Sequence, residues 1–194
     1  MTTVELLRVL GYVWAAFGGY WRGVAVGRKA DHASEPRLYF FLRLAVTVTT
    51  FTLLFSQRAA IGFMGRRFVP ASVALAYAGF AIALAGLGVA LWARRHLGQY
   101  WSDMVSLKRD HQLIRSGPYA TVRHPIYSGV LLGVAGTALL VGEWRGVLAF
   151  ALLFTTWTFK AKKEERILTE CFGGQFQEHR LRTGFLFPRF RARA

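Results

Sequence analysis

The chain has 194 residues, enough for one domain, and 54% of them are hydrophobic although the formal net charge is +15. This combination excludes an ordinary soluble domain. It is typical of apolar segments in lipid with Lys and Arg at anionic headgroups. Because the basic residues flank long apolar runs, we expect membrane lipids and not nucleic acid as the partner. Cys171 is the only cysteine, so an intrachain disulfide and a zinc site of several thiolates are both excluded.

The N-terminal half contains three apolar segments, and a membrane-spanning helix needs about 20 mostly apolar residues. We expect these helices over residues 6–26, 38–55 and 71–93. Pro70 stands where the third begins, a position that tolerates its missing N–H. The first segment carries Glu5 in place of a basic leader and lacks an A-x-A cleavage site, so we expect a retained helix. Gly86 and Gly88 in the third segment favour close helix packing over a nucleotide loop, because no strand precedes them.

The C-terminal half begins with a polar stretch, residues 94–125, which we expect to lie outside the membrane. A second apolar block, 127–159, is interrupted only by Gly142-Glu143-Trp144-Arg145, a pattern that predicts a helical hairpin. Residues 160–194 are basic and polar, with a short helix expected before Gly173. The sequence therefore predicts an all-α polytopic integral membrane protein with about five transmembrane helices.

This organisation predicts a single membrane domain over residues 1–194. Residues 1–93 would form three N-terminal transmembrane helices, and residues 94–194 a core that contains the hairpin. Most of the Lys and Arg outside the apolar segments lie on the side of the C-terminus, including Arg94, Arg95 and the basic stretch after residue 159. Because cytoplasmic segments carry the excess of Lys and Arg, we expect the N-terminus outside and the C-terminus in the cytoplasm.

The polar residues on either side of the hairpin could form a site, since a hairpin brings its two ends together. Gly117-Pro118 predicts a turn, and Pro125 suits the first turn of a helix with His124 as its cap. Such a helix start attracts anions, and Arg123 adds to that field. On the other side, Lys160 and Glu164 are four residues apart and share a helix face with Glu165 nearby. Together these groups could bind one zwitterionic ligand in a cytoplasmic pocket.

These residues fall in a pattern, H-x-L-x-x-x-G-x-Y-x-x-x-R-H-P-x-Y, which runs from His111 to Tyr127. It is followed by Glu164-Glu165, Phe172-Gly173 and a segment from Thr183 to Pro188. In this order the motifs resemble the isoprenylcysteine carboxyl methyltransferase family, integral-membrane enzymes that use S-adenosylmethionine. The resemblance covers roughly residues 95–190, and it implies a methyltransferase core there.

Position by position, the resemblance implies a cofactor site for S-adenosylmethionine. Its residues would be His111, Gln112, Leu113, Ile114, Tyr119, His124, Pro125, Ile126, Tyr127, Glu164 and Glu165. We expect Arg123, Lys160 and Glu164 to be the catalytic residues. The family commonly has Arg where this chain has Lys160, to hold the substrate carboxylate. Lysine keeps the positive charge but cannot form the two parallel hydrogen bonds of arginine, so the identity of the substrate is left open.

The leading reaction implied is methylation of a carboxylate on a lipidic acceptor, such as a prenylated cysteine. N-methylation of a phospholipid amine and S-methylation of a small thiol remain open. Two other classes remain as well: an NADPH-dependent membrane reductase and a non-catalytic membrane binding protein. A metal site from His111, His124 and His179 lacks the short spacing that metal sites favour, so we expect no metal.

Overall fold

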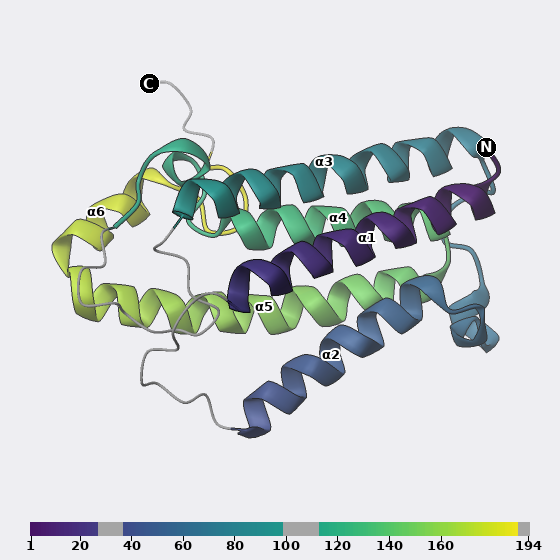
Figure 1. The fold of residues 1–194 in the computed structure, drawn as a ribbon, viewed down its shortest axis with the longest axis horizontal. Helices are drawn as coiled ribbons and strands as arrows, with labels where there is room; N and C mark the ends of the chain where they lie inside the picture. The colour runs from purple at the N-terminus through teal and green to yellow at the C-terminus, as the bar shows by residue number, and fades with distance from the viewer. Residues whose placement is uncertain (27–36, 99–112, 190–194) are drawn as a thin grey trace.

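The computed structural model describes residues 1–26, 37–98 and 113–189, and this part of the chain is all-helical, without strands (Figure 1). The predicted all-α fold is confirmed. The α-helices are α1 (Thr3–Val26), α2 (Arg37–Phe55), α3 (Val73–Leu97), α4 (Pro125–Val141), α5 (Trp144–Phe172) and α6 (Gly174–Arg182). Short 3-10 helices are η1 (Gln57–Ala59), η2 (Gly62–Gly65) and η4 (Gly117–Ala120).

The predicted hairpin is α4 and α5, joined at Gly142, whose φ of +70° is the left-handed conformation that glycine tolerates. Two predicted boundaries are wrong. α3 begins at Val73, capped by the Ser72 side chain, and not at residue 71, although Pro70 does lie just before the helix as expected. No separate helix precedes Gly173, because residues 160–172 are mostly good helix formers and continue α5 to Phe172. The short helix, α6, follows that glycine instead.

Helices α3 and α4 pack at backbone contact along small residues. A Cβ on Gly86 would lie 2.4 Å from the backbone nitrogen of Gly133, and one on Gly136 would lie 2.4 Å from that of Ala83. A Cβ on Gly129 would likewise lie 2.5 Å from the backbone nitrogen of Ala90. This is the small-residue packing of membrane helices, in which the missing side chains let two backbones meet. A Cβ on Gly88 would meet no atom within 4 Å, so only Gly86 of the predicted pair serves this packing.

Helix α1 attaches to this pair, and α2 to the start of α5, by specific contacts. The buried indole of Trp14 on α1 donates from Nε1 to Thr137 Oγ1 on α4 at 3.1 Å. Arg145, at the start of α5, is 1% exposed and donates from Nη1 to the carbonyls of Leu53 and Ser56 at 2.9 Å each. Its Nε pairs with Glu143 at 2.6 Å. Arg145 therefore caps the carbonyl end of α2 and ties it to the hairpin turn.

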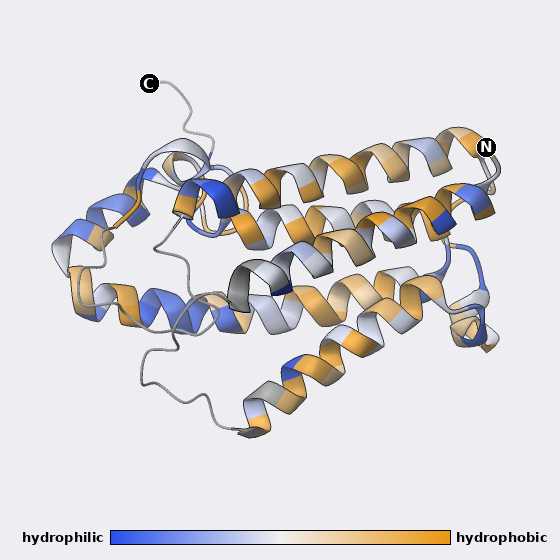
Figure 2. Cartoon of the chain, in the orientation of Figure 1, coloured by the Kyte–Doolittle hydropathy of each residue, from blue (hydrophilic) through white to orange (hydrophobic). Residues whose placement is uncertain are grey.

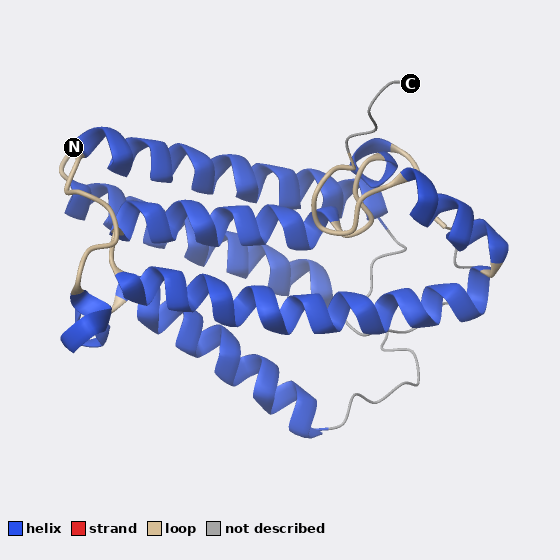
Figure 3. Ribbon diagram, turned by 180° about the vertical axis from the view of Figure 1, so that it is seen from behind, coloured by secondary structure: helices blue, strands red, loops and turns tan. Residues whose placement is uncertain are grey.

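The helices form an elongated bundle with two different ends. One end holds the N-terminus, the α2–α3 connection and the α4–α5 turn; α5 extends past the other end of the bundle and leads into α6 (Figures 1 and 3). Figure 2 shows that the far half of α5 and α6 are hydrophilic, whereas the bundle is mostly apolar. Large apolar side chains cover its outside, among them Leu38, Phe41 and Val48 on α2. Such a surface suits lipid better than water.

Within the described residues, α3 is the helix whose length and mean hydropathy of 2.1 meet the requirements for crossing a membrane by themselves. Phe41–Phe55 and Pro125–Val141 are apolar but shorter.

Substituting Gly86 should test the backbone contact between α3 and α4. Gly86→Ala is expected to lower the free energy of unfolding by about 1–3 kcal/mol, because its Cβ must displace main-chain atoms of α4. Gly88→Ala, on the same helix with open space around it, is the control. It should be neutral or gain up to about 1 kcal/mol from helix propensity. Thermal unfolding in detergent measures both, and equal effects would contradict the packing.

Candidate functional site

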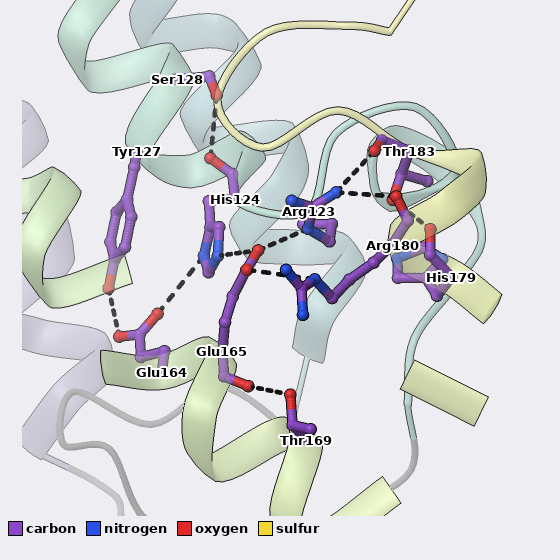
Figure 4. Close-up of polar contacts among 10 residues, drawn as sticks. All are labelled: Arg123, His124, Tyr127, Ser128, Glu164, Glu165, Thr169, His179, Arg180 and Thr183. Carbon is purple, nitrogen blue, oxygen red and sulfur yellow. Dashed lines mark hydrogen bonds and ion pairs between the residues drawn. The ribbon is translucent and has the colours of Figure 1, made fainter. Parts of the chain in front are cut away.

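The segments before α4 and after α6 lie side by side at the polar end of the bundle. Val122 and Gly184 form a parallel backbone bridge, and Arg123 donates its backbone N–H to the Gly184 carbonyl at 2.9 Å. The Ser128 hydroxyl donates to the Leu186 carbonyl at 2.6 Å. The polar stretches on either side of the hairpin therefore meet, as expected, and the end of α5 lies against them (Figure 4).

His124 lies at the centre of this site. It occupies the cap position of α4 with Pro125 as the first helical residue, as predicted, although its side chain makes no capping hydrogen bond. Its imidazole is instead placed between two consecutive glutamates of α5 (Figure 4). Nδ1 lies 3.5 Å from Glu164 Oε2, and Nε2 lies 3.5 Å from Glu165 Oε1. The imidazole thus separates the site into a Glu164 side and a Glu165 side.

On the Glu164 side, a carboxylate is held by three neighbours. The Tyr127 hydroxyl donates to Glu164 Oε1 at 2.5 Å, and Lys160 Nζ lies 4.0 Å from the same oxygen. Lys160 also stands 5.6 Å from the centre of the Tyr127 ring. That ring stacks on His124, with ring centres 5.5 Å apart, and the centre of the Trp157 ring lies 5.0 Å from it. The result is a carboxylate and an ammonium beside an aromatic wall.

On the Glu165 side, the carboxylate is paired with two arginines. Arg123 Nε lies 2.5 Å from Glu165 Oε1, and Arg180 Nε lies 3.7 Å from Oε2. Arg123 also donates from Nη1 to the Thr183 carbonyl at 2.6 Å and to the Arg180 carbonyl at 3.3 Å. Arg123, which we expected to be catalytic, therefore links the start of α4 to α5 and to the end of α6.

The charges of the central groups depend on one another. Burial alone would lower the pKa of His124, but the two carboxylates outweigh it and raise that pKa above its ordinary value. Burial would raise the pKa of Glu164 and of Glu165, but His124 with Lys160 and Tyr127, or with Arg123, lowers both below the ordinary value. At neutral pH both glutamates are therefore anions.

Other predicted site residues form a second group against the C-terminal end of α3. Ile114, Tyr119 and Ile126 pack around the buried Ala93. The Tyr119 hydroxyl donates to the Ala93 carbonyl at 3.5 Å, and burial raises its pKa, with Glu164 acting in the same direction. Leu113 is half-buried and Pro125 is buried. The predicted residues His111 and Gln112 lie outside the described residues.

Sequence reasoning missed three residues of the site: Trp157, Arg180 and Phe185. Trp157 is one turn before Lys160, so the spacing of Trp157, Lys160 and Glu164 could have placed it on the same helix face. Phe185 packs edge-on against His124, with ring centres 5.2 Å apart. Nothing in the local sequence distinguishes Arg180 from its basic neighbours, because its partner Glu165 is on another helix.

The pH dependence of stability should report the His124 contacts. Stability from a raised histidine pKa is fully present below 6.5, the ordinary value, and is lost as the pH rises through the raised value. The stability that the two glutamates contribute is present above pH 4.5, their ordinary pKa, and is lost as the pH falls through their lowered pKa values. His124→Asn should therefore lower the free energy of unfolding most, by about 2 kcal/mol, between pH 4.5 and 6.5, and by less at higher pH.

His179 provides a control of opposite sign. Burial, with Arg115 and Arg123 nearby, lowers its pKa, so its contribution is present above 6.5 and lost as the pH falls. Melting temperatures across this range measure both variants. The stability lost in His124→Asn should shrink with rising pH while that lost in His179→Asn grows, and parallel trends would contradict the assigned charges.

Comparison with known proteins agrees with the resemblance seen in the motifs. Residues 78–170 match the model described as the isoprenylcysteine carboxyl methyltransferase (ICMT) family. This match begins inside α3, earlier than the motifs suggested, and ends before the segment from Thr183 to Pro188.

Similar curated proteins include two named protein-S-isoprenylcysteine O-methyltransferases. That of Schizosaccharomyces pombe is 38% identical over 88 residues, 43% of this chain and 36% of the relative. Form B of Arabidopsis thaliana is 32% identical over 87 residues, 42% of this chain and 43% of the relative. The cobalt-zinc-cadmium resistance protein CzcN of Cupriavidus metallidurans is 33% identical over 113 residues, 56% of this chain and 49% of the relative. The matches span less than half the length of each.

A solved structure shares the fold. It is that of a eukaryotic intramembrane Ras methyltransferase, ICMT, with a TM-score of 0.51 and 21% identity. The match covers 81% of this chain and 54% of the other, so the likeness extends into the N-terminal helices, where the family model does not reach. Residues 78–170 of the chain are therefore similar to the isoprenylcysteine carboxyl methyltransferase family, and the fold is that of this solved methyltransferase.

Proposed function

We propose that this protein is an S-adenosylmethionine-dependent methyltransferase that acts at the membrane on the carboxylate of a lipidic or amphipathic acceptor. The observation that carries the proposal is the ionised Glu164 carboxylate, fixed by Tyr127 and His124 beside the Lys160 ammonium. A prenylated cysteine is the acceptor that the names of the Schizosaccharomyces pombe and Arabidopsis thaliana relatives suggest.

The residues on the Glu164 side fit the methyl donor. S-adenosylmethionine carries an amine and a sulfonium, both cationic, and an aromatic base. Glu164 supplies a negative charge, which the lowered pKa maintains at neutral pH, and the rings of Tyr127 and Trp157 supply faces that attract cations and bases. Ile114 and Tyr119 would bound the site from the α3 side. When bound, the donor supplies an electrophilic methyl group.

Lys160 is the residue suited to the acceptor. Its ammonium lies on the same helix face as Glu164, so it can attract an anionic acceptor close to a donor that Glu164 holds. A carboxylate is already ionised near neutral pH and needs no general base. The work of these side chains is then to fix two oppositely charged reactants in line, and such positioning contributes as much as about 7–11 kcal/mol in model systems.

We also propose that residues 1–194 form one membrane domain, with about five spanning helices, α1 to α5, the last being the part of α5 up to residue 159. The apolar outer surface and the alternation of the helices between the two ends of the bundle support this arrangement. α4 is short for a full span, which flanking residues at the headgroup level can accommodate. The excess of Lys and Arg at the α6 end supports a cytoplasmic site and an N-terminus outside.

The other acceptors and functions differ in what they require. An amine or thiol acceptor would need a proton acceptor, and Glu164, Glu165 or His124 would have to take that role. A reductase would bind NADPH, and a non-catalytic protein would bind neither NADPH nor S-adenosylmethionine. Although one relative is named for metal resistance, no three metal-ligating side chains are grouped as a metal site in residues 1–26, 37–98 and 113–189.

Binding of the donor should depend on the charge of Glu164. Glu164→Gln keeps the size of the side chain but removes the anion, so affinity for S-adenosylmethionine and its demethylated product should fall by about tenfold or more. Glu170→Gln, at an exposed position on the same helix, is the control and should bind normally. Calorimetry with both ligands and with NADPH measures this. Unchanged binding in Glu164→Gln, or binding of NADPH alone, would reject the proposal.

Lys160 should affect the acceptor and not the donor. In Lys160→Ala we expect a rise in KM for a carboxylate acceptor of about tenfold or more, because a charge-assisted contact is lost. Donor affinity should change by less than about threefold. Lys160→Arg should restore most of the acceptor binding, since the charge returns. Methyl transfer to a prenylcysteine analogue, with donor binding measured in parallel, tests this, and equal loss of both affinities would contradict the assignment.

A further inference from the structure

A basic hollow lies on the Glu165 side of the site. It has a volume of about 430 Å³, and its lining includes Arg123, Lys162, Glu165, Arg166, Arg180 and Phe185. Lys160, Tyr127 and Trp157 do not line it, and the His124 ring stands between Glu165 and the Glu164 carboxylate. This hollow is therefore separate from the proposed donor site, although its lining residue Glu165 contacts His124.

Among the residues that the structure describes, the lining of this hollow carries an excess of positive charge. Four basic side chains face one carboxylate, and Glu165 is already paired with Arg123 and Arg180. Neither Lys162 nor Arg166 has an ion pair among the described residues, and both are exposed on α5. Bringing like charges together costs free energy unless an anion joins them, so the arrangement favours an anionic ligand.

The geometry of the basic groups suits a phosphate. Arg123 is held in place by Glu165 and by the Thr183 carbonyl, so one guanidinium is fixed at the wall. Arg180 is half-exposed, with a side-chain exposure of 47%, and its 3.7 Å contact with Glu165 involves only Nε. Arginines with free N–H groups bind tetrahedral anions in the forked geometry that lysine lacks, and Lys162 adds a point charge. The volume admits a headgroup and not merely a small ion.

The position along α5 agrees with a ligand from the membrane. Lys162 and Arg166 lie one to two turns beyond the apolar half of α5, in the part of the helix that is hydrophilic (Figure 2). In the proposed orientation this is the level of the cytoplasmic headgroups, whose anionic lipids attract Lys and Arg.

We propose that this hollow, defined by Arg123, Lys162, Arg166 and Arg180, binds the phosphate group of an anionic phospholipid, or a soluble phosphate ester of the same chemistry. The ligand's phosphate replaces water among the basic groups while Glu165 continues to fix Arg123. The two sources of phosphate differ only in whether the group is anchored in the bilayer, and the experiment separates them.

The test compares two double variants that remove equal charge from the same end of the molecule. Lys162→Gln with Arg166→Gln alters the hollow. Lys163→Gln with Arg182→Gln is the control, because Lys163 lies over the Tyr39 ring and Arg182 pairs with Glu178, both outside the hollow. Each protein is purified in a neutral detergent, and its melting temperature is followed as phosphatidylglycerol, phosphatidylcholine or glycerol phosphate is added.

Phosphatidylglycerol should raise the melting temperature of the wild-type protein and of the control, and phosphatidylcholine should not. In the Lys162/Arg166 variant the apparent affinity should fall by about tenfold or more. A shift with glycerol phosphate as well would show that the phosphate alone suffices, and a shift with the lipid only would show that the bilayer anchor is needed. No shift in the wild type, or equal loss in the control, would overturn the inference.

Binding of S-adenosylmethionine is measured on the same samples. The Lys162/Arg166 variant should keep it, because neither residue lies on the Glu164 side. A wild-type protein that binds the phospholipid but not S-adenosylmethionine would reject the proposed function and leave the phosphate site intact.

Discussion

The contact of one imidazole with two consecutive carboxylates determines the arrangement of the polar end of this protein. Adjacent residues on a helix point about 100° apart, so Glu164 and Glu165 cannot face the same ligand by themselves. His124 occupies the angle between them, at 3.5 Å from each. One carboxylate is thereby turned toward Tyr127 and Lys160, and the other toward Arg123 and Arg180. Two consecutive glutamates thus face two adjacent parts of the site, which differ in charge.

The contact of His124 with Glu164 and Glu165 depends on how far α4 is shifted along its axis relative to α5. The hairpin turn at Gly142 sets it from the far end, and the backbone bridge between Val122 and Gly184 sets it near the site. Arg145 adds the α2 end to the same turn. The polar end is therefore positioned by contacts at both ends of the bundle, in addition to the packing of the apolar middle.

The sequence predicted the parts of this protein that follow from local chemistry. Apolar runs located α1 to α4, and Pro125 with the Gly142 turn located the hairpin. The motif residues His124, Tyr127, Lys160 and Glu164 do come together. Helix ends were less predictable, because the charged residues after Lys160 can continue a helix or end it, and only Gly173 decides. Arg123 illustrates a further limit: its charge suggested catalysis, but its partners Glu165 and Thr183 come from distant segments.

The resemblance to the family rested on motifs from residue 111 onward, whereas the family model begins at residue 78, within α3. The structure explains the difference. α3 and α4 meet at their backbones, so α3 is inseparable from the motif helix even though its own sequence reads only as a run of small and apolar residues. No pattern in α3 alone indicates which of its glycines face α4.

The glycine contact also bears on how such proteins can diverge. Because α3 and α4 meet backbone to backbone, neither helix can be replaced without its counterpart, and the two must evolve as a matched pair. α1 meets the pair through side chains such as Trp14, and α2 meets α5 through Arg145, contacts that can be exchanged one at a time. A lineage can thus remodel the apolar flank formed by α1 and α2 while inheriting the polar end unchanged.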